Sequence, residues 1–357
     1  MRQVTDLNFP LCFAPMVGLS HVALRRVIQD YLPQNASTPW PTEMLNSRRV
    51  PGENLKKTPE TLRRDEEQHL VPQILGNEEI PIQKSVQRLV QEWGAAGIDI
   101  NMGCPVQKAL KHNYGVSLMG DIDYAARVVE MTKRYSTVPV SVKLRAVGSE
   151  KTIPQLILFV QKLVDSGADW ITLHPRTAEQ KRRGQADWGQ ITELKKALKV
   201  PVIGNGDIQT VDDVLAMLQE TKADKVMAGR ALAARPWLMW QLAEKISSEK
   251  SPWIFHQNLK GLRAPQTEVE EGAEYGRCLL RLIDYSEESF ISRAGAAESL
   301  VVRKIQFYIR TTHVWLEFGH TLMAWTSRCQ SLIELKEVIQ RFFTTEQRMM
   351  ARTELRQ

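Results

Sequence analysis

The sequence predicts an α/β fold, a (β/α)₈ TIM barrel followed by a smaller, all-helical C-terminal domain. Short β-rich segments alternate with helix-like segments over about 230 residues, the count and length of such a barrel. The 357 residues are also enough for one large domain and a smaller one. A doubly wound parallel sheet is the alternative, and it needs a reversal of strand order that a sequence does not reveal.

The predicted strands are short, and several are apolar along almost their whole length, as in VPVSVKL, WITLH and VPVIG. Strands covered by helices on both faces of a sheet have this composition. The predicted strands are residues 11–14, 42–44, 70–75, 97–101, 139–144, 170–174, 201–204 and 224–228.

The segments between these strands carry apolar residues at helical spacing, as in IQKSVQRLVQEWGAAG, IPQLILFVQKLVDSGA, ITELKKALK and VDDVLAMLQETKA. After Ile246 the chain becomes polar and contains proline, which is typical of a linker or a capping loop. From Thr267 the pattern is helical to the end of the sequence. We therefore expect a barrel domain over 1–246 and a helical domain over 247–357.

Composition narrows the class of protein. No run of 18 apolar residues occurs and the N-terminus lacks an apolar signal region, so we expect a cytoplasmic protein without a membrane span. Lys and Arg total 47 against 41 Asp and Glu, a net charge of +6 that is compatible with a polyanionic partner. The four cysteines stand apart, so we expect neither a metal site nor a disulfide framework. Cys12, Cys278 and Cys329 lie in apolar stretches and are predicted core residues.

Barrel active sites form at the carboxyl ends of the strands, and phosphate is usually held after the last two. Here those ends carry Gly204-Asn205-Gly206-Asp207 and Gly229-Arg230. Glycines let backbone N–H groups approach phosphate oxygens, and an arginine adds positive charge. The alternative is that these glycines only make tight turns between strand and helix.

Three side chains at other strand ends suggest chemistry. Lys143 ends a buried strand and needs an anion or a dipole to compensate its charge, and an ion pair with Glu43 is the alternative explanation. His174 is either a functional group or a satisfied core histidine. Cys104 lies in a Gly-Cys-Pro turn, where it acts as a general acid or simply as a small turn residue.

Taken in order, these strand ends resemble the bacterial FMN-dependent tRNA-dihydrouridine synthases. The most specific match is N-M-G-C-P-V-Q-K-A-L-K from Asn101, with G-V-S-L-M following. APMVG, TEM, the strand of Gln73, SVKLR, H-x-R-T, ADW, GNGD and AGR follow the order of the family's other blocks. The resemblance runs from Phe13 to about Trp237 and continues more weakly into the C-terminal helices.

The resemblance implies that the chain reduces the C5–C6 double bond of specific tRNA uridines to dihydrouridine. NADPH would reduce FMN, hydride would reach C6, and Cys104 would protonate C5. No G-x-G-x-x-G follows a strand, which fits a reductant that docks on the flavin and leaves. The partners are thus tRNA and NADPH, and we expect a monomer.

The resemblance also assigns residues. The expected FMN contacts are Pro15, Met16, Val17, Gln73, Lys143, His174, Asn205, Gly206, Asp207, Gly229 and Arg230. The expected RNA contacts are Asn101, Lys108, Lys111, Arg145 and Arg176. Two basic groups, Lys181-Arg182-Arg183 and the helical set Arg303, Lys304 and Arg310, are further candidates for RNA phosphates, with solvated surface charge as the alternative.

The sequence departs from the family's pattern in three places. His21 replaces a common Asp, RAVGSEKT replaces an Arg-x-Gly segment, and KRRG replaces an aromatic-Ser-Gly segment. Two alternative functions therefore stand beside the first: a flavin-dependent reductase of small molecules, and a divergent member that acts on another RNA or only binds RNA.

Overall fold

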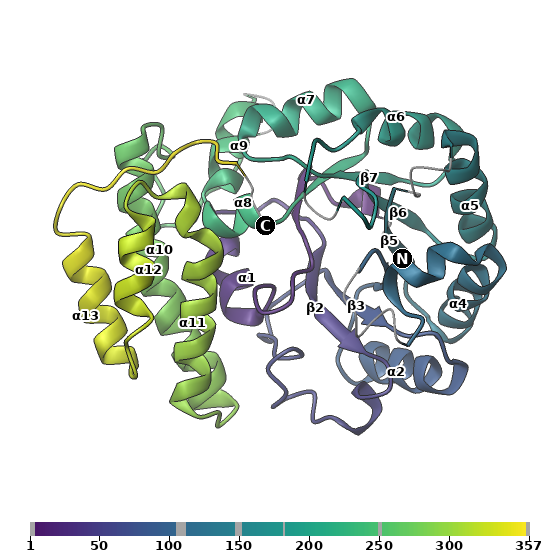
Figure 1. Ribbon diagram of the computed structural model, residues 1–357, viewed down its shortest axis with the longest axis horizontal. Helices are drawn as coiled ribbons and strands as arrows, with labels where there is room; N and C mark the ends of the chain where they lie inside the picture. Colours follow the sequence, from purple (N-terminus) through teal and green to yellow (C-terminus); the bar gives the residue numbers. More distant parts are fainter. Residues whose placement is uncertain (1–3, 105–111, 147–151, 181–182, 249–251, 355–357) are drawn as a thin grey trace.

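The computed structural model describes residues 4–104, 112–146, 152–180, 183–248 and 252–354. Its eight parallel strands form one curled sheet in the order β1-β8-β7-β6-β5-β4-β3-β2 (Figure 1). They are β1 (Leu11–Phe13), β2 (Trp40–Asn46), β3 (Leu70–Leu75), β4 (Ile98–Met102), β5 (Val140–Arg145), β6 (Trp170–His174), β7 (Val202–Asn205) and β8 (Lys225–Ala228). All eight predicted strands are present, and the predicted fold class is confirmed.

The two ends of the sheet, β1 and β2, meet through bonds near the start of β2. Phe9 N donates to Ser37 O at 2.9 Å, and the Thr38 hydroxyl donates to Leu11 O at 2.8 Å. These bonds bring the first and last strands of the sheet order together, and the sheet takes the shape of a barrel.

Helices cover the outside of the barrel (Figure 1). They are α1 (Val22–Gln29), α2 (Glu79–Gln91), α4 (Ile122–Tyr135), α5 (Ile153–Asp165), α6 (Trp188–Ala197), α7 (Val211–Thr221), α8 (Arg230–Ala234) and α9 (Leu238–Ile246). Side chains define where several of them begin: Thr210 and Asp213 form a capping box on α7, and Asp121 caps α4. Such caps satisfy backbone N–H groups that have no partner within the helix.

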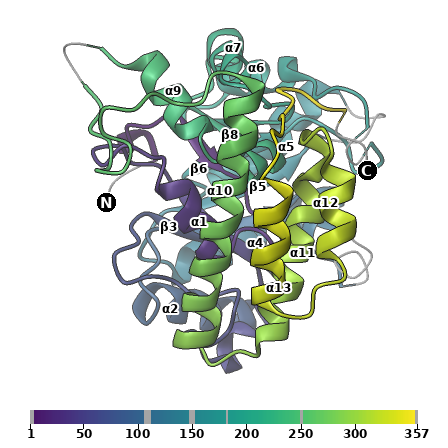
Figure 2. The ribbon, with the colours of Figure 1, turned by 90° about the vertical axis from the view of Figure 1, so that its left-hand side faces the viewer.

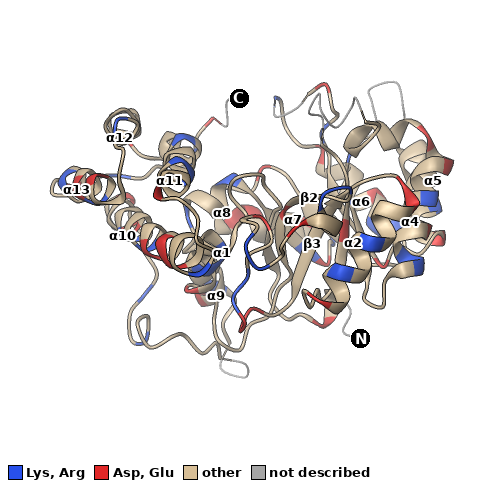
Figure 3. Cartoon of the chain, turned by 90° about the horizontal axis from the view of Figure 1, so that it is seen from below, with Lys and Arg blue, Asp and Glu red and all other residues tan. Residues whose placement is uncertain are grey.

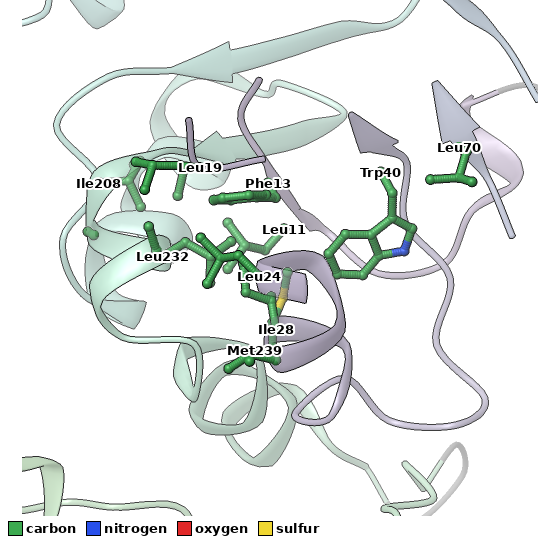
Figure 4. Packing of buried hydrophobic residues seen from close by; sticks show 14 of the residues in the cluster. Leu11, Phe13, Leu19, Leu24, Ile28, Trp40, Leu70, Ile208, Leu232 and Met239 are labelled. Carbon is green, nitrogen blue, oxygen red and sulfur yellow. The ribbon is translucent and has the colours of Figure 1, made fainter. Parts of the chain in front are cut away.

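Alternation along β1 separates the two layers of the core. Leu11 and Phe13 point toward the surrounding helices, where they meet Leu24 of α1 and Leu232 of α8 (Figure 4). Cys12 points the other way, into the barrel interior, with a cluster that includes Ala14, Val71, Trp170, Ile203 and Met227. Burial raises the pKa of the Cys12 thiol to about 12. The prediction that Cys12, Cys278 and Cys329 are core residues is confirmed, since all three are buried.

Four further α-helices follow the barrel: α10 (Glu268–Ser286), which runs on into a π-helical segment (Glu287–Arg293), α11 (Glu298–Thr312), α12 (Gly319–Thr326) and α13 (Leu332–Phe342). They stand side by side against one flank, with α10 next to α1 and α11 next to α8 (Figure 2). Across the first of these contacts the Tyr285 hydroxyl donates to the carboxylate of Asp30 at 2.9 Å. The boundary at residue 246 stays a prediction.

The segment between barrel and helices packs against the barrel. Gln34 N donates to Ile254 O at 2.7 Å, and the Trp253 ring meets the Phe9 ring edge-on at 5.6 Å. Of the two readings of this segment, a capping loop describes these contacts better than a free linker. Within the described ranges, no helix is both long and apolar enough to cross a membrane.

A fully buried ion pair ties α1 to the loop before β3. Arg25 Nε and Nη2 donate to the two carboxylate oxygens of Glu67 at 2.8 and 2.9 Å, and neither side chain is exposed. Arg25 also donates to the backbone oxygens of Ser20 and Leu62. Burial raises the pKa of Glu67, but Arg25 and, to a smaller extent, Arg64 together hold the pKa below its usual value. The carboxylate is therefore charged at neutral pH and depends on Arg25.

We expect Arg25→Met to lower the free energy of unfolding by about 3–5 kcal/mol, because it leaves a buried carboxylate without its counter-charge. Urea denaturation measures this loss. The double variant Arg25→Met/Glu67→Met should lose less than the single one, since no unpaired charge remains. Equal losses would show that the charge of Glu67 does not matter.

Candidate active site

Because the strands are parallel, their carboxyl ends open at one mouth of the barrel. The predicted residues that the sheet brings to this end are Gln73 on β3, Asn101 on β4, Lys143 and Arg145 on β5, His174 on β6 and Asn205 on β7. The register places Asn101 opposite Lys143 and Arg145 opposite His174. The parallel sheet thus gathers the side chains of these predicted residues around one mouth.

Positive charge dominates this mouth. Four cations act on His174, namely Lys143, Arg145, Arg176 and Arg230. Together with burial, which is the larger cause, they lower the pKa of His174 to about 2. The imidazole is therefore neutral, and because a guanidinium only donates, His174 Nε2 accepts from Arg176 Nη1 at 3.3 Å.

Lys143 has a neutral partner. Its Nζ donates to Asn205 Oδ1 at 3.2 Å, and Asn205 is fixed in turn by its own donation to Met227 O at 2.7 Å. Burial, with Arg145 adding to it, lowers the pKa of Lys143 to about 8. The predicted alternative is an ion pair with Glu43. In the described contacts the Glu43 carboxylate instead accepts from Gly18 N and Lys304 Nζ.

The turn after β7 is tight and fixed by hydrogen bonds. Gly206 has φ +122°, and a Cβ there would lie 2.8 Å from Ala186 Cβ and 3.1 Å from His174 Cδ2. Asp207 accepts from Ala186 N at 2.6 Å and from Arg176 Nη2 at 2.5 Å. Arg176 is only 5% exposed. Besides Asp207 and His174, Arg176 also binds the backbone oxygens of Arg183 and Gly184, and its role as an RNA contact stays a prediction.

The turn after β1 lies beside the end of β8. A Cβ on Gly229 would lie 3.3 Å from Met16 Sδ, so a larger residue there would fill the space next to Met16. Met16 N donates to the Ser20 hydroxyl at 2.6 Å, whereas Val17 is 56% exposed. Pro15, Met16 and Val17 therefore form a turn with an open apolar side chain at the mouth.

Helix α11 contacts this same turn, a link that the sequence did not suggest. Gly18, at φ +78°, donates its N–H to Glu43 Oε2 at 2.5 Å, and Glu43 Oε1 accepts from Lys304 Nζ at 3.4 Å. A Cβ on Gly18 would lie 2.7 Å from a ring atom of Phe307. The C-terminal helices thus contact the turn after β1, and Figure 3 shows α11 standing next to α8 at the side of the barrel.

This contact corrects the expectation of a basic face formed by Arg303, Lys304 and Arg310. Arg303 and Arg310 are exposed, but the Lys304 side chain is only 13% exposed and turns toward Glu43. Its ammonium also lies over the Phe290 ring, 5.1 Å from the centroid. Helical spacing placed the three residues on one helix but did not show that the middle one faces inward.

Cys104 is 9% exposed at the end of β4. Asn101 Oδ1 accepts from Cys104 N at 3.0 Å, and Cys104 O accepts from Val116 N at 3.2 Å. A Cβ on Gly115, at φ +58°, would lie 2.6 Å from Cys104 O. The backbone of Cys104 is thus held on both sides. Lys108 and Lys111, and also Lys181 and Arg182, lie outside the described residues.

Two further residues near the site are Asp99 and His21. Asp99, which the sequence analysis passed over, lies on β4 opposite Gln73 and is 8% exposed. His21, a departure from the family's pattern, caps α1 by accepting from Leu24 N at 3.4 Å. Burial, aided by Lys304 and Arg25, lowers its pKa far below the usual value, so the ring is neutral and able to accept. Among the described residues, no group of three or more His, Cys, Asp or Glu could hold a metal ion.

A family model and the similar curated proteins both indicate dihydrouridine synthases. Residues 12–340 match the model of the dihydrouridine synthase (Dus) family. The probable tRNA-dihydrouridine synthase 1 of Synechocystis is 34% identical over 64% of this chain and 63% of its own length. Probable tRNA-dihydrouridine synthases of Helicobacter pylori strain 26695 and Rickettsia conorii are 30% and 33% identical over 70% and 69% of this chain, and 74% and 73% of theirs.

Solved structures with some likeness include a nitroalkane oxidase from Streptomyces ansochromogenes, at 14% identity. The likeness covers 64% of this chain and 67% of that chain, with a TM-score of 0.39. At this level it adds nothing to the description of the fold or the site.

We expect Lys304→Met to lower the free energy of unfolding by about 1–3 kcal/mol, because among its described partners the Glu43 carboxylate would keep only the Gly18 N–H. Urea denaturation checks this, with Arg303→Met as the exposed control, which should change stability by less than about 0.5 kcal/mol. Lys304→Met/Glu43→Gln should recover part of the loss. Strictly additive losses would contradict a direct interaction between the two side chains.

Proposed function

This chain belongs to the dihydrouridine synthase family, and we propose that it is an FMN- and NADPH-dependent tRNA-dihydrouridine synthase. The reaction saturates the C5–C6 bond of uridine with one hydride and one proton. The observation that carries the proposal is the group of four cations that act on His174, at a mouth where β4 also ends in Cys104. An anionic cofactor and an RNA substrate both match such a site.

The residues at the mouth fit FMN. Gly229 leaves space beside Met16, and Gly206 and Asp207 form a turn that Arg176 and Ala186 hold rigid. We propose that the backbone of these two turns, with Arg230 and the neutral His174, holds the phosphate. Pro15, Met16 and Val17 would contact the ring.

Lys143 and Gln73 would lie at the polar edge of the ring. Bound FMN supplies hydride chemistry, and a nearby ammonium favours the negative charge of its reduced form. Lys143 is suited to this because its partner is the neutral amide of Asn205 rather than a carboxylate. Asp99 is close enough to raise the pKa of Lys143, but the described hydrogen bonds of its carboxylate go to Ser141 and Gln73, which leaves the ammonium suited to bind an anion.

Cys104 is the proposed general acid. A thiol held at a fixed backbone position meets the first requirement of such a group, which is geometry relative to the proton acceptor. Its backbone is bound by Asn101 on one side and Val116 on the other. Asn101 and Arg145 would contact the base or its phosphate.

The reaction requires that the enzyme reach the edge and the face of the uracil base. A uridine in an RNA loop can leave its stack at lower cost than one in a helix. That the RNA is tRNA is supported by the names of the relatives. Exposed Arg303 and Arg310, on the helix that borders the mouth, are the described candidates for phosphate contacts. The domain boundary, the monomeric state and a cytoplasmic location remain predictions.

We expect Cys104→Ala to slow dihydrouridine formation in unmodified tRNA by about 100-fold or more, the scale of a lost general acid. Mass spectrometry of digested tRNA measures the product, and NADPH should still bleach the flavin absorbance of the variant. Cys329→Ala, another buried thiol, is the matched control and should remain active. Wild-type rates with Cys104→Ala would exclude the thiol as the acid.

A further inference from the structure

We infer that Asp99 is a positioning residue that fixes the orientation of two buried amides, Gln73 and Asn101, and through them the presentation of Cys104. The inference rests on the proposed function only in naming Cys104 as the group that reacts. The three linked side chains are themselves a feature of the described structure.

The first link joins two neighbouring strands inside the barrel. Asp99 on β4 accepts from the Ser141 hydroxyl at 2.6 Å with one oxygen and from Gln73 Nε2 at 2.6 Å with the other. Burial raises the pKa of Asp99 to about 6, against the lowering effect of these two hydrogen bonds and of Lys143. The carboxylate is therefore ionised at neutral pH and only accepts hydrogen bonds.

Because Asp99 only accepts, it determines which way the amides of Gln73 and Asn101 are turned. Gln73 must turn its NH₂ group to Asp99, which leaves its Oε1 to accept from Asn101 Nδ2 at 2.8 Å. Asn101 must then direct its Oδ1 to the backbone, where it accepts from Gly103 N at 3.2 Å and Cys104 N at 3.0 Å. The direction set by one carboxylate thus reaches the backbone of Cys104.

Burial makes the reversed orientations of these two amides unfavourable. Gln73 is 0% exposed, and Asp99 and Asn101 are 8% exposed each, so water competes little for these groups. Reversing the Asn101 amide would place its NH₂ group against two backbone N–H donors. A buried donor without an acceptor costs more than the hydrogen bond it replaces. Reversing Gln73 alone would face its oxygen toward a carboxylate.

An exchange of side chains tests the direction of the relay. Gln73→Glu removes the donor and sets two carboxylates against each other. In the double variant Gln73→Glu/Asp99→Asn, the new amide can donate to the new carboxylate, which still accepts from Asn101. In the single variant, repulsion from Asp99 pushes the new carboxylate, which is the acceptor of Asn101 Nδ2, out of place. The single change should therefore free the backbone of Cys104, and the double change should restore it.

The readout is the rate at which iodoacetamide alkylates Cys104 in the full-length protein as purified, measured by mass spectrometry of its peptide. We expect about a ten-fold faster reaction in Gln73→Glu and in Asp99→Leu, matching the loss of about one buried hydrogen bond. The double variant should react within about two-fold of wild type. Ser141→Ala, which leaves the acceptor in place, is the matched control and should react like wild type.

Cys12 provides an internal reference, because it lies inside the barrel on β1 and is fully buried. The inference is overturned if Gln73→Glu and Asp99→Leu leave the Cys104 rate unchanged, if the double variant stays as fast as Gln73→Glu, or if Cys12 accelerates equally and the barrel has opened as a whole. None of these rates requires flavin or RNA. A protein that lacks reductase activity but shows the expected pattern would refute the proposed function and leave the relay standing.

Discussion

The charge that the barrel collects at its mouth is the constraint on which the rest of the site depends. The strand ends and turns bring Lys143, Arg145, Arg176 and Arg230 around one imidazole. Burying like charges together is costly unless anions or dipoles offset them. The chain offers Asp207 to Arg176 and the amide of Asn205 to Lys143. An anionic cofactor and a polyanionic substrate would interact favourably with these four cations.

The C-terminal helices are part of this site as well as its neighbours. Lys304 reaches Glu43 on β2, and Glu43 holds the Gly18 turn that follows β1. Phe307 packs on the same glycine, which has no side chain to obstruct it. The helix that would meet RNA thus touches the turn that would meet the flavin. Barrel and helices are joined where the two proposed binding functions would meet.

The strands were predictable because burial on both faces leaves a run of apolar residues, and WITLH matches β6 at both ends. The mouth was predictable because parallel strands share an end. Contacts between distant side chains were not, since helical spacing does not show that Lys304 faces a carboxylate 261 residues away. The sequence did contain a sign of Asp99, since it is a charged residue inside the strand IDINM. It precedes Asn101 by two residues, so the two side chains lie on the same face of the strand.

The most direct test of the proposed chemistry is the visible absorbance of the purified protein without oxygen, before NADPH, after one equivalent of NADPH, and after excess unmodified tRNA. The account predicts flavin bands that bleach with NADPH and return when tRNA is added, with dihydrouridine formed in proportion. A colourless protein that cannot be reconstituted with FMN would contradict it. So would a reduced flavin that tRNA leaves unchanged while a small enone reoxidises it.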